Sequence, residues 1–239
     1  MFVLGIEAAT PVASVAVATD GKILAERMVN NQRTHSVNLL PMIRDTLLDC
    51  GVDKQELSGI AVSIGPGSFT GLRIGMSTAK TLAQVLNLPV AGIPTLDVLA
   101  YPLSGLTGLI CPVLNARKSE LYAALYGWDK GQQICYKPAF AAGVKQLAEL
   151  LLPYKQQVTF LGDGLPQYKS ELSSLIGALA RFAPECASFP RGAVVAEIGL
   201  ARISAGHSES PMGLLPKYVR KSEAEIKWQE RCRSGHGQS

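Results

Sequence analysis

One segment of the chain combines glycines, hydroxyl side chains and a following helical pattern, as anion-binding turns do. It reads Gly65-Pro66-Gly67-Ser68-Phe69-Thr70-Gly71 and lies between an apolar strand pattern and a helical one. Backbone N–H groups at such a helix N-terminus can face a phosphate. The segment lacks the Walker ending Gly-Lys-Ser/Thr and the GxGxxG spacing. It therefore predicts either a phosphate cradle or a tight turn in which Ser68 or Thr70 caps the helix.

Two other turns carry residues that suit nucleotide phosphates. Glu7 and Thr10 lie between the first two predicted strands, and Gly162 and Asp163 follow a strand in the second half of the chain. If the two turns face each other across a cleft, these four residues are candidates for binding the phosphates of a nucleotide. Neither turn matches a specific nucleotide-binding motif. The stretch Asn115-Ala116-Arg117 would place a cation over the same cleft or simply solvate a loop.

A single histidine, His35, precedes the first predicted helix. A helical metal site needs a second histidine about four residues later, and that position is Leu39. The other histidines, His207 and His236, are far along the chain, so we predict no metal site. A catalytic triad built from Ser68 and His35 has no nucleophile-elbow pattern to support it.

The helix after the glycine-rich segment has apolar residues on more than one side. Gly71, Gly75 and Ala79 form a stripe of small residues, and Leu72 to Leu86 contains a heptad seam, while Ile74 lies on another face. Surplus apolar surface on a helix indicates a second packing partner, inside the chain or outside it. We expect the two helices over 36–50 and 69–87 to form a protein interface. The expected interface residues are His35, Leu39, Leu40, Ile43, Leu47, Leu72, Gly75, Met76, Ala79 and Ala83.

The bulk composition describes a well-packed globular protein. The chain has 239 residues, 47% of them hydrophobic and 18% charged, with a net charge of +4. Three of the four excess positive charges lie after Pro216, so the body is nearly neutral and lacks the basic face of a protein that grips nucleic acid alone. The five cysteines are scattered and form no CxxC pair, which is typical of a reducing cytosol. The N-terminus begins as a strand, and no apolar run is long enough to span a membrane. We therefore expect a cytoplasmic protein without a membrane span.

The order of the predicted elements indicates an α/β protein with two lobes. The first hundred residues predict strands over 2–6, 12–18 and 22–29, a helix to Cys50, a strand over 58–64, a helix over 69–87 and a strand over 89–93. A less complete set follows, with strands over 109–114, 120–126 and 158–161 and helices over 144–152, 170–182 and 193–205. We expect an N-terminal lobe over 1–104, which also receives 193–221, a C-terminal lobe over 105–192, and a disordered tail over 222–239.

Several of these segments resemble one protein family closely. They are Leu4-Gly5-Ile6-Glu7-Ala8-Ala9-Thr10, His35-Ser36 with Leu39-Leu40-Pro41, Gly65 to Gly75 with Ala79-Lys80, and Lys217-Tyr218-Val219-Arg220. In these segments the chain resembles the TsaB (YeaZ) family of bacterial tRNA threonylcarbamoyladenosine synthesis, over about residues 1–220. The resemblance implies a two-lobed actin/hexokinase-like ATPase (ASKHA) fold, with mixed sheets flanked by helices.

The resemblance also implies a role. Members of the family are non-catalytic partners of the homologous TsaD subunit, with TsaE as a third, ATPase component. The complex transfers threonylcarbamoyl from threonylcarbamoyl-adenylate to N6 of the adenosine beside the anticodon in tRNAs that read codons beginning with A. We therefore expect this chain to have no cofactor of its own, with ATP or ADP bound at a boundary between subunits. We expect it to bind tRNA only through the complex. Alone, the chain is expected to form a homodimer.

Three departures from related proteins bear on this role. Leu39 stands where the catalytic paralogue carries its second metal-binding histidine, and Asn115 stands where the family usually has Asp. Glu7 also replaces the usual phosphate-loop Asp of the fold, which disfavours ATP hydrolysis by this chain alone. The competing hypothesis is an independent ATP-dependent phosphotransferase that uses Glu7, Thr10 and the Gly162-Asp163-Gly164 turn.

Overall fold

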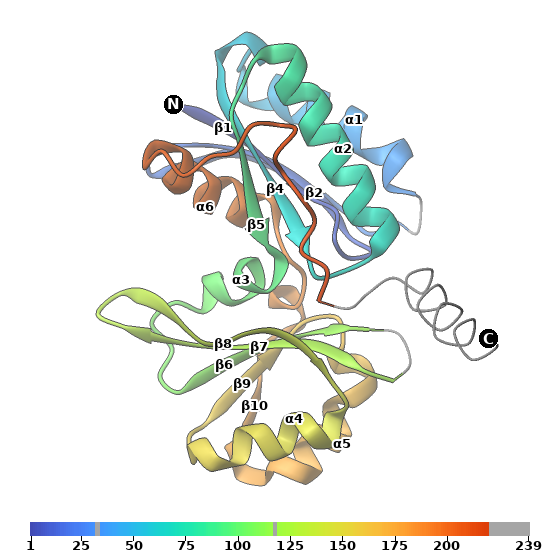
Figure 1. Ribbon diagram of the computed structural model, residues 1–239, viewed down its shortest axis with the longest axis vertical. Helices are drawn as coiled ribbons and strands as arrows, with labels where there is room; N and C mark the ends of the chain where they lie inside the picture. The colour runs from blue at the N-terminus through green and yellow to red at the C-terminus, as the bar shows by residue number, and fades with distance from the viewer. Residues whose placement is uncertain (32–33, 117–118, 220–239) are drawn as a thin grey trace, which may run out of the picture.

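The structure, a computed structural model, describes residues 1–31, 34–116 and 119–219. It contains two lobes, each built on one five-stranded mixed sheet flanked by helices (Figure 1). The strand orders are β3-β2-β1-β4-β5 and β10-β9-β6-β7-β8, so in each lobe an antiparallel three-stranded meander continues into two parallel strands. This is the expected actin/hexokinase-like architecture, in which one supersecondary pattern occurs twice.

Lobe 1 places helices on both faces of its sheet. Its elements are β1 (Phe2–Glu7), β2 (Ala13–Thr19), β3 (Lys22–Val29), α1 (His35–Cys50), β4 (Leu57–Gly65), α2 (Phe69–Leu86), β5 (Val90–Pro94) and α3 (Thr95–Ala100). Helices α1 and α2 lie side by side on one face, and α6 (Gly192–Ser204) packs on the other (Figure 1). The central strand β1 is buried on both faces, which explains its continuous apolar sequence.

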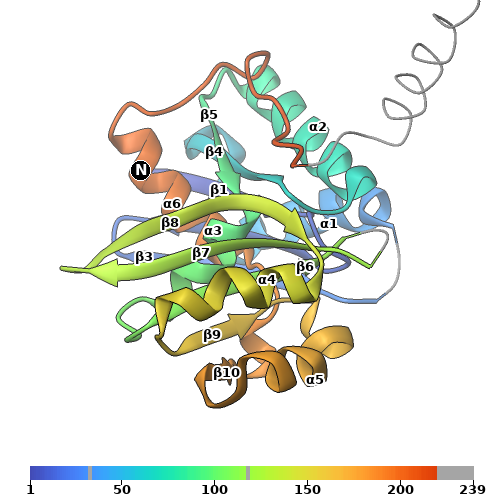
Figure 2. The same ribbon diagram turned by 60° about the horizontal axis from the view of Figure 1, so that its bottom comes forward.

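Lobe 2 covers one face of its sheet with two helices (Figure 2). Its elements are β6 (Leu109–Asn115), β7 (Leu121–Asp129), β8 (Gln132–Ala142), α4 (Val144–Leu151), β9 (Val158–Leu161), α5 (Leu165–Ile176) and β10 (Ala180–Phe182). The other face packs on α3, where Leu96, Leu99, Ile110 and Leu161 belong to one buried cluster. The two lobes therefore share a hydrophobic core at their junction.

After α6 the chain returns along the outside of lobe 1. Glu209 forms an antiparallel bridge with Val90 of the edge strand β5, and Leu214 is buried under it. The backbone N–H of Lys217 donates to the carbonyl of Ile64 at 2.7 Å. Residues 205–219, called here the C-terminal strap, thus cover an open sheet edge.

The structure corrects several predicted elements. Strands β8 and β10 were missed, and the helix expected over 170–182 runs instead from Leu165 to Ile176. Strand β8 contains Pro138 and exposed polar residues, as edge strands do, and β10 has only three residues. The tail expected to be disordered, 222–239, lies outside the described residues.

Candidate functional site

The glycine-rich turn packs directly on the chain's own backbone. The N–H of Ser68 donates to the carbonyl of Ala9 at 2.7 Å. A side chain at Gly67 would collide with that carbonyl, and one at Gly71 would collide with the carbonyl of Ala8. The Ser68 hydroxyl accepts the N–H of Gly71 at 3.3 Å and caps α2. The structure therefore shows a tight turn in which Ser68 caps α2 and the glycines let the segment pack against Ala8 and Ala9.

Glu7 and Thr10, the lobe 1 nucleotide-loop candidates, are turned into their own lobe. The Glu7 side chain is fully buried, accepts the Ala9 N–H at 2.6 Å and accepts a hydrogen bond from the Ser63 hydroxyl. Burial raises the pKa of Glu7 to about 7, although these hydrogen bonds oppose the rise. The Thr10 hydroxyl accepts the Val12 N–H at 3.3 Å. Neither side chain has surface with which to contact Mg-ATP, so the structure contradicts this part of the nucleotide-site prediction.

The lobe 2 turn is held in a similar way. Gly162 adopts a φ of +119° against the carbonyl of Val113, a conformation that requires glycine. Asp163 accepts the N–H of Asn115 at 2.8 Å, and burial raises the pKa of its carboxyl. The turn therefore joins the ends of β6 and β9. Arg117, the expected cation, lies outside the described residues.

His35 is a core residue at the start of α1. Its Nε2 lies 2.9 Å from the carbonyl oxygen of Thr10, and its ring packs where a side chain at position 71 would stand. Ser68 and His35 thus contact other groups and not each other. The structure therefore does not support a catalytic triad built from them. Within the residues that the structure describes, no group of three or more His, Cys, Asp or Glu side chains is arranged to hold a metal ion.

Most of the expected interface residues are buried inside lobe 1. His35, Leu39, Ile43, Leu72, Gly75, Met76, Ala79 and Ala83 are buried, and Leu47 packs against the same core. The small residues let α2 approach the sheet closely, since a side chain at Gly75 would contact Ala8 and Val62. The heptad seam thus contacts the chain's own sheet, and these positions are corrected from interface to core. Leu40 is the exposed member of the predicted set.

A different set of apolar side chains faces outward from the two helices. Leu48 and Val85 are 72% and 76% exposed. We define the helix face as the exposed apolar residues of α1 and α2, which are Val37, Leu40, Leu48, Phe69 and Val85. On α1 the three residues lie within about 80° of each other on the outer side, whereas Phe69 and Val85 lie about 160° apart around α2. A contiguous exposed apolar patch marks a protein-binding surface, and the outward residues of α1 together with Val85 are the candidates for one here.

The C-terminal strap extends this face. The Tyr218 ring stacks on Phe69 with centroids 5.4 Å apart, and the guanidinium of Arg73 lies 4.2 Å from the Phe69 centroid. The ammonium of Lys80 donates to the carbonyl of Leu214 at 3.1 Å. Sequence reasoning missed this stack, because Phe69 and Tyr218 come from distant parts of the chain, the start of α2 and the C-terminal strap.

Comparison with known proteins gives consistent results. A protein-family model described as "TsaD: tRNA N6-adenosine threonylcarbamoyltransferase" matches residues 22–228. The tRNA threonylcarbamoyladenosine biosynthesis protein TsaB of Bacillus subtilis is 31% identical over 230 residues, which are 96% of this chain and 99% of that protein. The TsaB of Escherichia coli is 36% identical over 54% of this chain and 57% of its own length.

A solved structure supports the fold. YeaZ from Pseudomonas aeruginosa superposes with a TM-score of 0.76 at 24% identity, covering 91% of this chain and 99% of that chain. In the described part of this chain, no helix is long and apolar enough to cross a bilayer.

Proposed function

This chain belongs to the TsaB (YeaZ) family of tRNA threonylcarbamoyladenosine biosynthesis proteins, and from that premise we propose that it is an accessory subunit without a catalytic centre of its own. The subunit binds a TsaD-like catalytic paralogue through the helix face. Binding activates that paralogue to transfer threonylcarbamoyl from threonylcarbamoyl-adenylate to N6 of the adenosine beside the anticodon in tRNAs reading ANN codons. The exposed apolar residues of α1 and α2 carry this proposal.

The hydrogen bonds within the two nucleotide turns support an accessory role. Both carboxylate oxygens of Glu7 accept hydrogen bonds from its own lobe, and Asp163 caps the end of β6. An independent phosphotransferase would need such groups to hold Mg²⁺ and phosphate in an accessible cleft. The structure therefore disfavours the competing hypothesis.

The choice of partner rests on the likeness between this chain and the transferase family. The family model that matches most of the chain is described as a transferase, so a catalytic paralogue would share the two-lobed fold. Two homologous lobes can pair through equivalent helices in a pseudo-symmetric interface. The same face would pair two copies of this chain when the paralogue is absent, which gives a homodimer. A TsaE-like ATPase, ATP or ADP at a subunit boundary, and tRNA would join only the assembled complex.

The decisive experiment places charge on the helix face without touching the core. In the double variant Leu48→Glu, Val85→Glu both side chains stay in water, so the lobe should fold normally. We expect the variant to lose co-elution with the paralogue and the tRNA modification that the reconstituted complex performs. The matched control is Leu152→Glu, Leu175→Glu, which changes two exposed leucines of lobe 2. Full complex formation by the first variant would contradict the proposed interface.

The catalytic alternative has its own test. Purified chain alone should show no ATP turnover above that of Glu7→Gln. Robust hydrolysis that depends on Glu7 would support the phosphotransferase hypothesis and contradict the accessory role.

A further inference from the structure

The turn between β1 and β2, residues 8–12, contacts the first residues of both α1 and α2. His35, the first residue of α1, brings its Nε2 to 2.9 Å from the carbonyl oxygen of Thr10. Ser68, the N-cap residue of α2, donates its N–H to the carbonyl of Ala9 at 2.7 Å. Two consecutive carbonyls of one turn therefore set where the two helices begin relative to each other.

The two helices also touch each other at this end. Gly71 of α2 lies against the His35 ring, because a side chain at position 71 would meet the ring carbon Cδ2 at 3.1 Å and collide with the carbonyl of Ala8. Within the described residues, the side chain of the N-cap residue Thr34 makes no cap bond to α1. The His35 ring is thus the contact by which the start of α1 meets both the turn and α2.

A buried carboxyl holds the turn in place. Glu7 accepts the N–H of Ala9 at 2.6 Å and a hydrogen bond from the hydroxyl of Ser63 in β4. The carbonyl of Ala9 in turn accepts the N–H of Ser68. This line of hydrogen bonds runs from the sheet through the turn to the start of α2, so the turn cannot shift without moving the helix.

The two side chains that fix the turn are unfavourable for the stability of the lobe. A carbonyl oxygen can only accept, so Nε2 of His35 carries the hydrogen, and Nδ1 is left buried without a partner among the described residues. Glu7 is fully buried, and a carboxyl away from water is costly to ionise. Costs of this kind gather where backbone geometry serves function, which indicates that the placement of this turn matters in itself.

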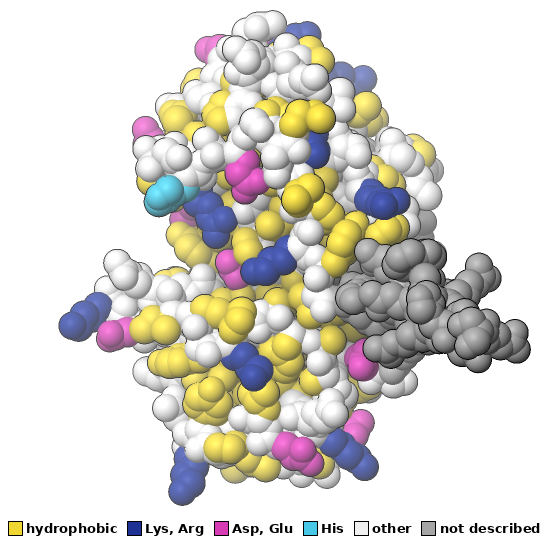
Figure 3. All heavy atoms as spheres, viewed as in Figure 1, with side chains coloured by type: hydrophobic (Ala, Val, Ile, Leu, Met, Phe, Trp, Pro, Cys, Tyr) yellow, Lys and Arg dark blue, Asp and Glu magenta, His cyan; other side chains and the backbone are white. Residues whose placement is uncertain are grey.

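The outward residues of α1 lie at different distances from this anchored end. From the helical rise per residue, Leu40 is about 8 Å and Leu48 about 20 Å along the axis from His35. Val37 and Leu40 are both more than half exposed. In the space-filling view, hydrophobic side chains lie at the surface over the neighbouring α2 and the C-terminal strap (Figure 3). A shift of the start of α1 would therefore move Val37 and Leu40 more than Leu48.

We propose that His35 is a positioning residue for the helix face and acts through the turn that Glu7 holds in place. The bond from Nε2 to Thr10 fixes the start of α1 against α2, which sets the placement of Val37 and Leu40 for the catalytic paralogue. This inference rests on the proposed function, because it concerns the same face. The face can bind the paralogue without any contribution from His35, so the two claims are tested separately.

The affinity of the full chain for the paralogue, measured by isothermal titration calorimetry, tests the role of His35. His35→Leu keeps an apolar side chain against Gly71 but removes the donor, and it should weaken binding about tenfold. His35→Asn, whose amide is too short to reach Thr10, should do the same. His35→Gln places an amide N–H near the position of Nε2 and should bind within about twofold of the native chain. Native binding by His35→Leu and His35→Asn, or equal weakening by His35→Gln, would overturn the proposal.

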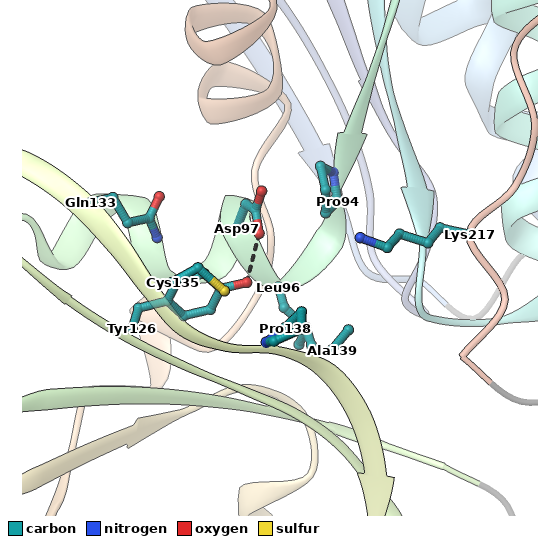
Figure 4. Close-up of a pocket in the computed structure, with 9 residues that line it drawn as sticks. All are labelled: Pro94, Leu96, Asp97, Tyr126, Gln133, Cys135, Pro138, Ala139 and Lys217. Carbon is teal, nitrogen blue, oxygen red and sulfur yellow. Dashed lines mark hydrogen bonds between the residues drawn. The ribbon is translucent and has the colours of Figure 1, made fainter.

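Two controls remove buried hydrogen bonds elsewhere in the chain. Thr46 donates its hydroxyl to the carbonyl of Met42 within α1 at 2.7 Å. The Tyr126 hydroxyl donates to Asp97 Oδ1 at 2.6 Å in the recess between the two lobes (Figure 4). Thr46→Val and Tyr126→Phe should lose stability much as His35→Leu does, yet keep native affinity. A loss of affinity in proportion to the loss of stability in all three variants would make His35 a merely structural residue and overturn the proposal.

A double-mutant cycle separates failure of this inference from failure of the proposed function. Leu40→Ala and Leu48→Ala should each weaken binding alone, and if neither does, the proposed function fails and this inference with it. In the His35→Leu background, Leu40→Ala should have a clearly smaller effect, because Leu40 is already displaced, whereas Leu48→Ala should be additive. Additivity of His35→Leu with both would overturn the positioning role and leave the proposed function intact.

Discussion

The helix pair of lobe 1 differs from the helix pair of lobe 2, although both cover sheets of the same topology. Helices α1 and α2 expose Val37, Leu40, Leu48 and Val85. Helices α4 and α5 expose mostly polar and charged residues, such as Lys145, Gln146, Glu149, Lys169 and Glu171. Because both pairs bury an apolar face on their own sheet, the difference lies only on the outer side. The two lobes thus share a topology and a buried helix–sheet layer but differ in the outer face of the helix pair.

The largest expected effect is a difference in stability between a substitution on the inner face of α2 and one on its outer face. Ala79 is fully buried against the sheet, so Ala79→Arg should place a large charged group in the core and destabilise the protein by about 4 kcal/mol or more. Val85→Arg on the outer face should change stability by about 0.5 kcal/mol or less. Urea unfolding followed by circular dichroism measures both. Similar stability of the two variants would show that the assignment of the faces is wrong.

The second prediction uses the buried carboxyl of lobe 1. The pKa of Glu7 is about 7 in the folded protein, against 4.5 for an exposed glutamate. Below pH 4.5 both states hold the proton and there is no penalty. Between these values the unfolded state loses its proton first, so stability falls as the pH rises, and the loss is complete above pH 7. It amounts to about 3 kcal/mol, from 1.36 kcal/mol per pKa unit.

Glu7→Gln should remove this decline, so its stability relative to the native chain should rise by about 3 kcal/mol from pH 4 to pH 8. Asp163→Asn in lobe 2 should change in the same direction by a smaller amount, because Asp163 is only partly buried. Urea titrations at several pH values measure both variants. Parallel pH curves for Glu7→Gln and the native chain would contradict the buried, proton-retaining carboxyl.

The third prediction concerns association of the chain with itself. Leu48→Glu, Val85→Glu should shift the proposed homodimer toward monomer, with dissociation constants raised about tenfold to a hundredfold, or about 1.4 to 2.7 kcal/mol. Leu152→Glu, Leu175→Glu in lobe 2 should leave the equilibrium unchanged. Light scattering after size-exclusion chromatography distinguishes the two. Dissociation caused by the lobe 2 variant instead would assign the interface to the other helix pair.

The smallest expected effect concerns the strap. Tyr218→Ala removes the stack on Phe69 and should cost about 1 kcal/mol. A double-mutant cycle with Phe69→Ala, measured by denaturant unfolding, isolates the contact of the two rings. Strict additivity of the two single effects would mean that the rings do not interact.

Much of the fold could be predicted because its signals are local. The continuous apolar run of β1 and the spacing in α1 and α2 identify their elements, and Gly51 ends α1 in a left-handed conformation that glycine favours. Strand β8 could not be recognised in this way, since Pro138 and exposed polar residues break its pattern. The helix predicted over 170–182 was placed too far along the chain. Its expected end, Ala180–Phe182, is a strand because it pairs with β9, a contact that local sequence does not reveal.

The candidate sites were predicted less well because their chemistry depends on orientation. Asp163 lies in a turn as predicted, whereas Glu7 is the last residue of β1, and each accepts hydrogen bonds from its own lobe. The recess between the two lobes, which Asp97, Gln133 and Lys217 help to line, was not predicted. These three residues come from distant parts of the chain. No spacing rule connects such residues before the two lobes are packed together.

The sequence by itself determined the order of the elements in lobe 1, the glycine-rich turn, and the absence of a second histidine at Leu39. These are properties of neighbouring residues, and local periodicity and residue type are enough to specify them. Only the tertiary structure decided which apolar side of α2 meets the sheet and which faces outward. Both sides carry apolar residues, so their roles depend on close backbone packing at Gly71 and Gly75, which long-range contacts with β1 and the turn after it create.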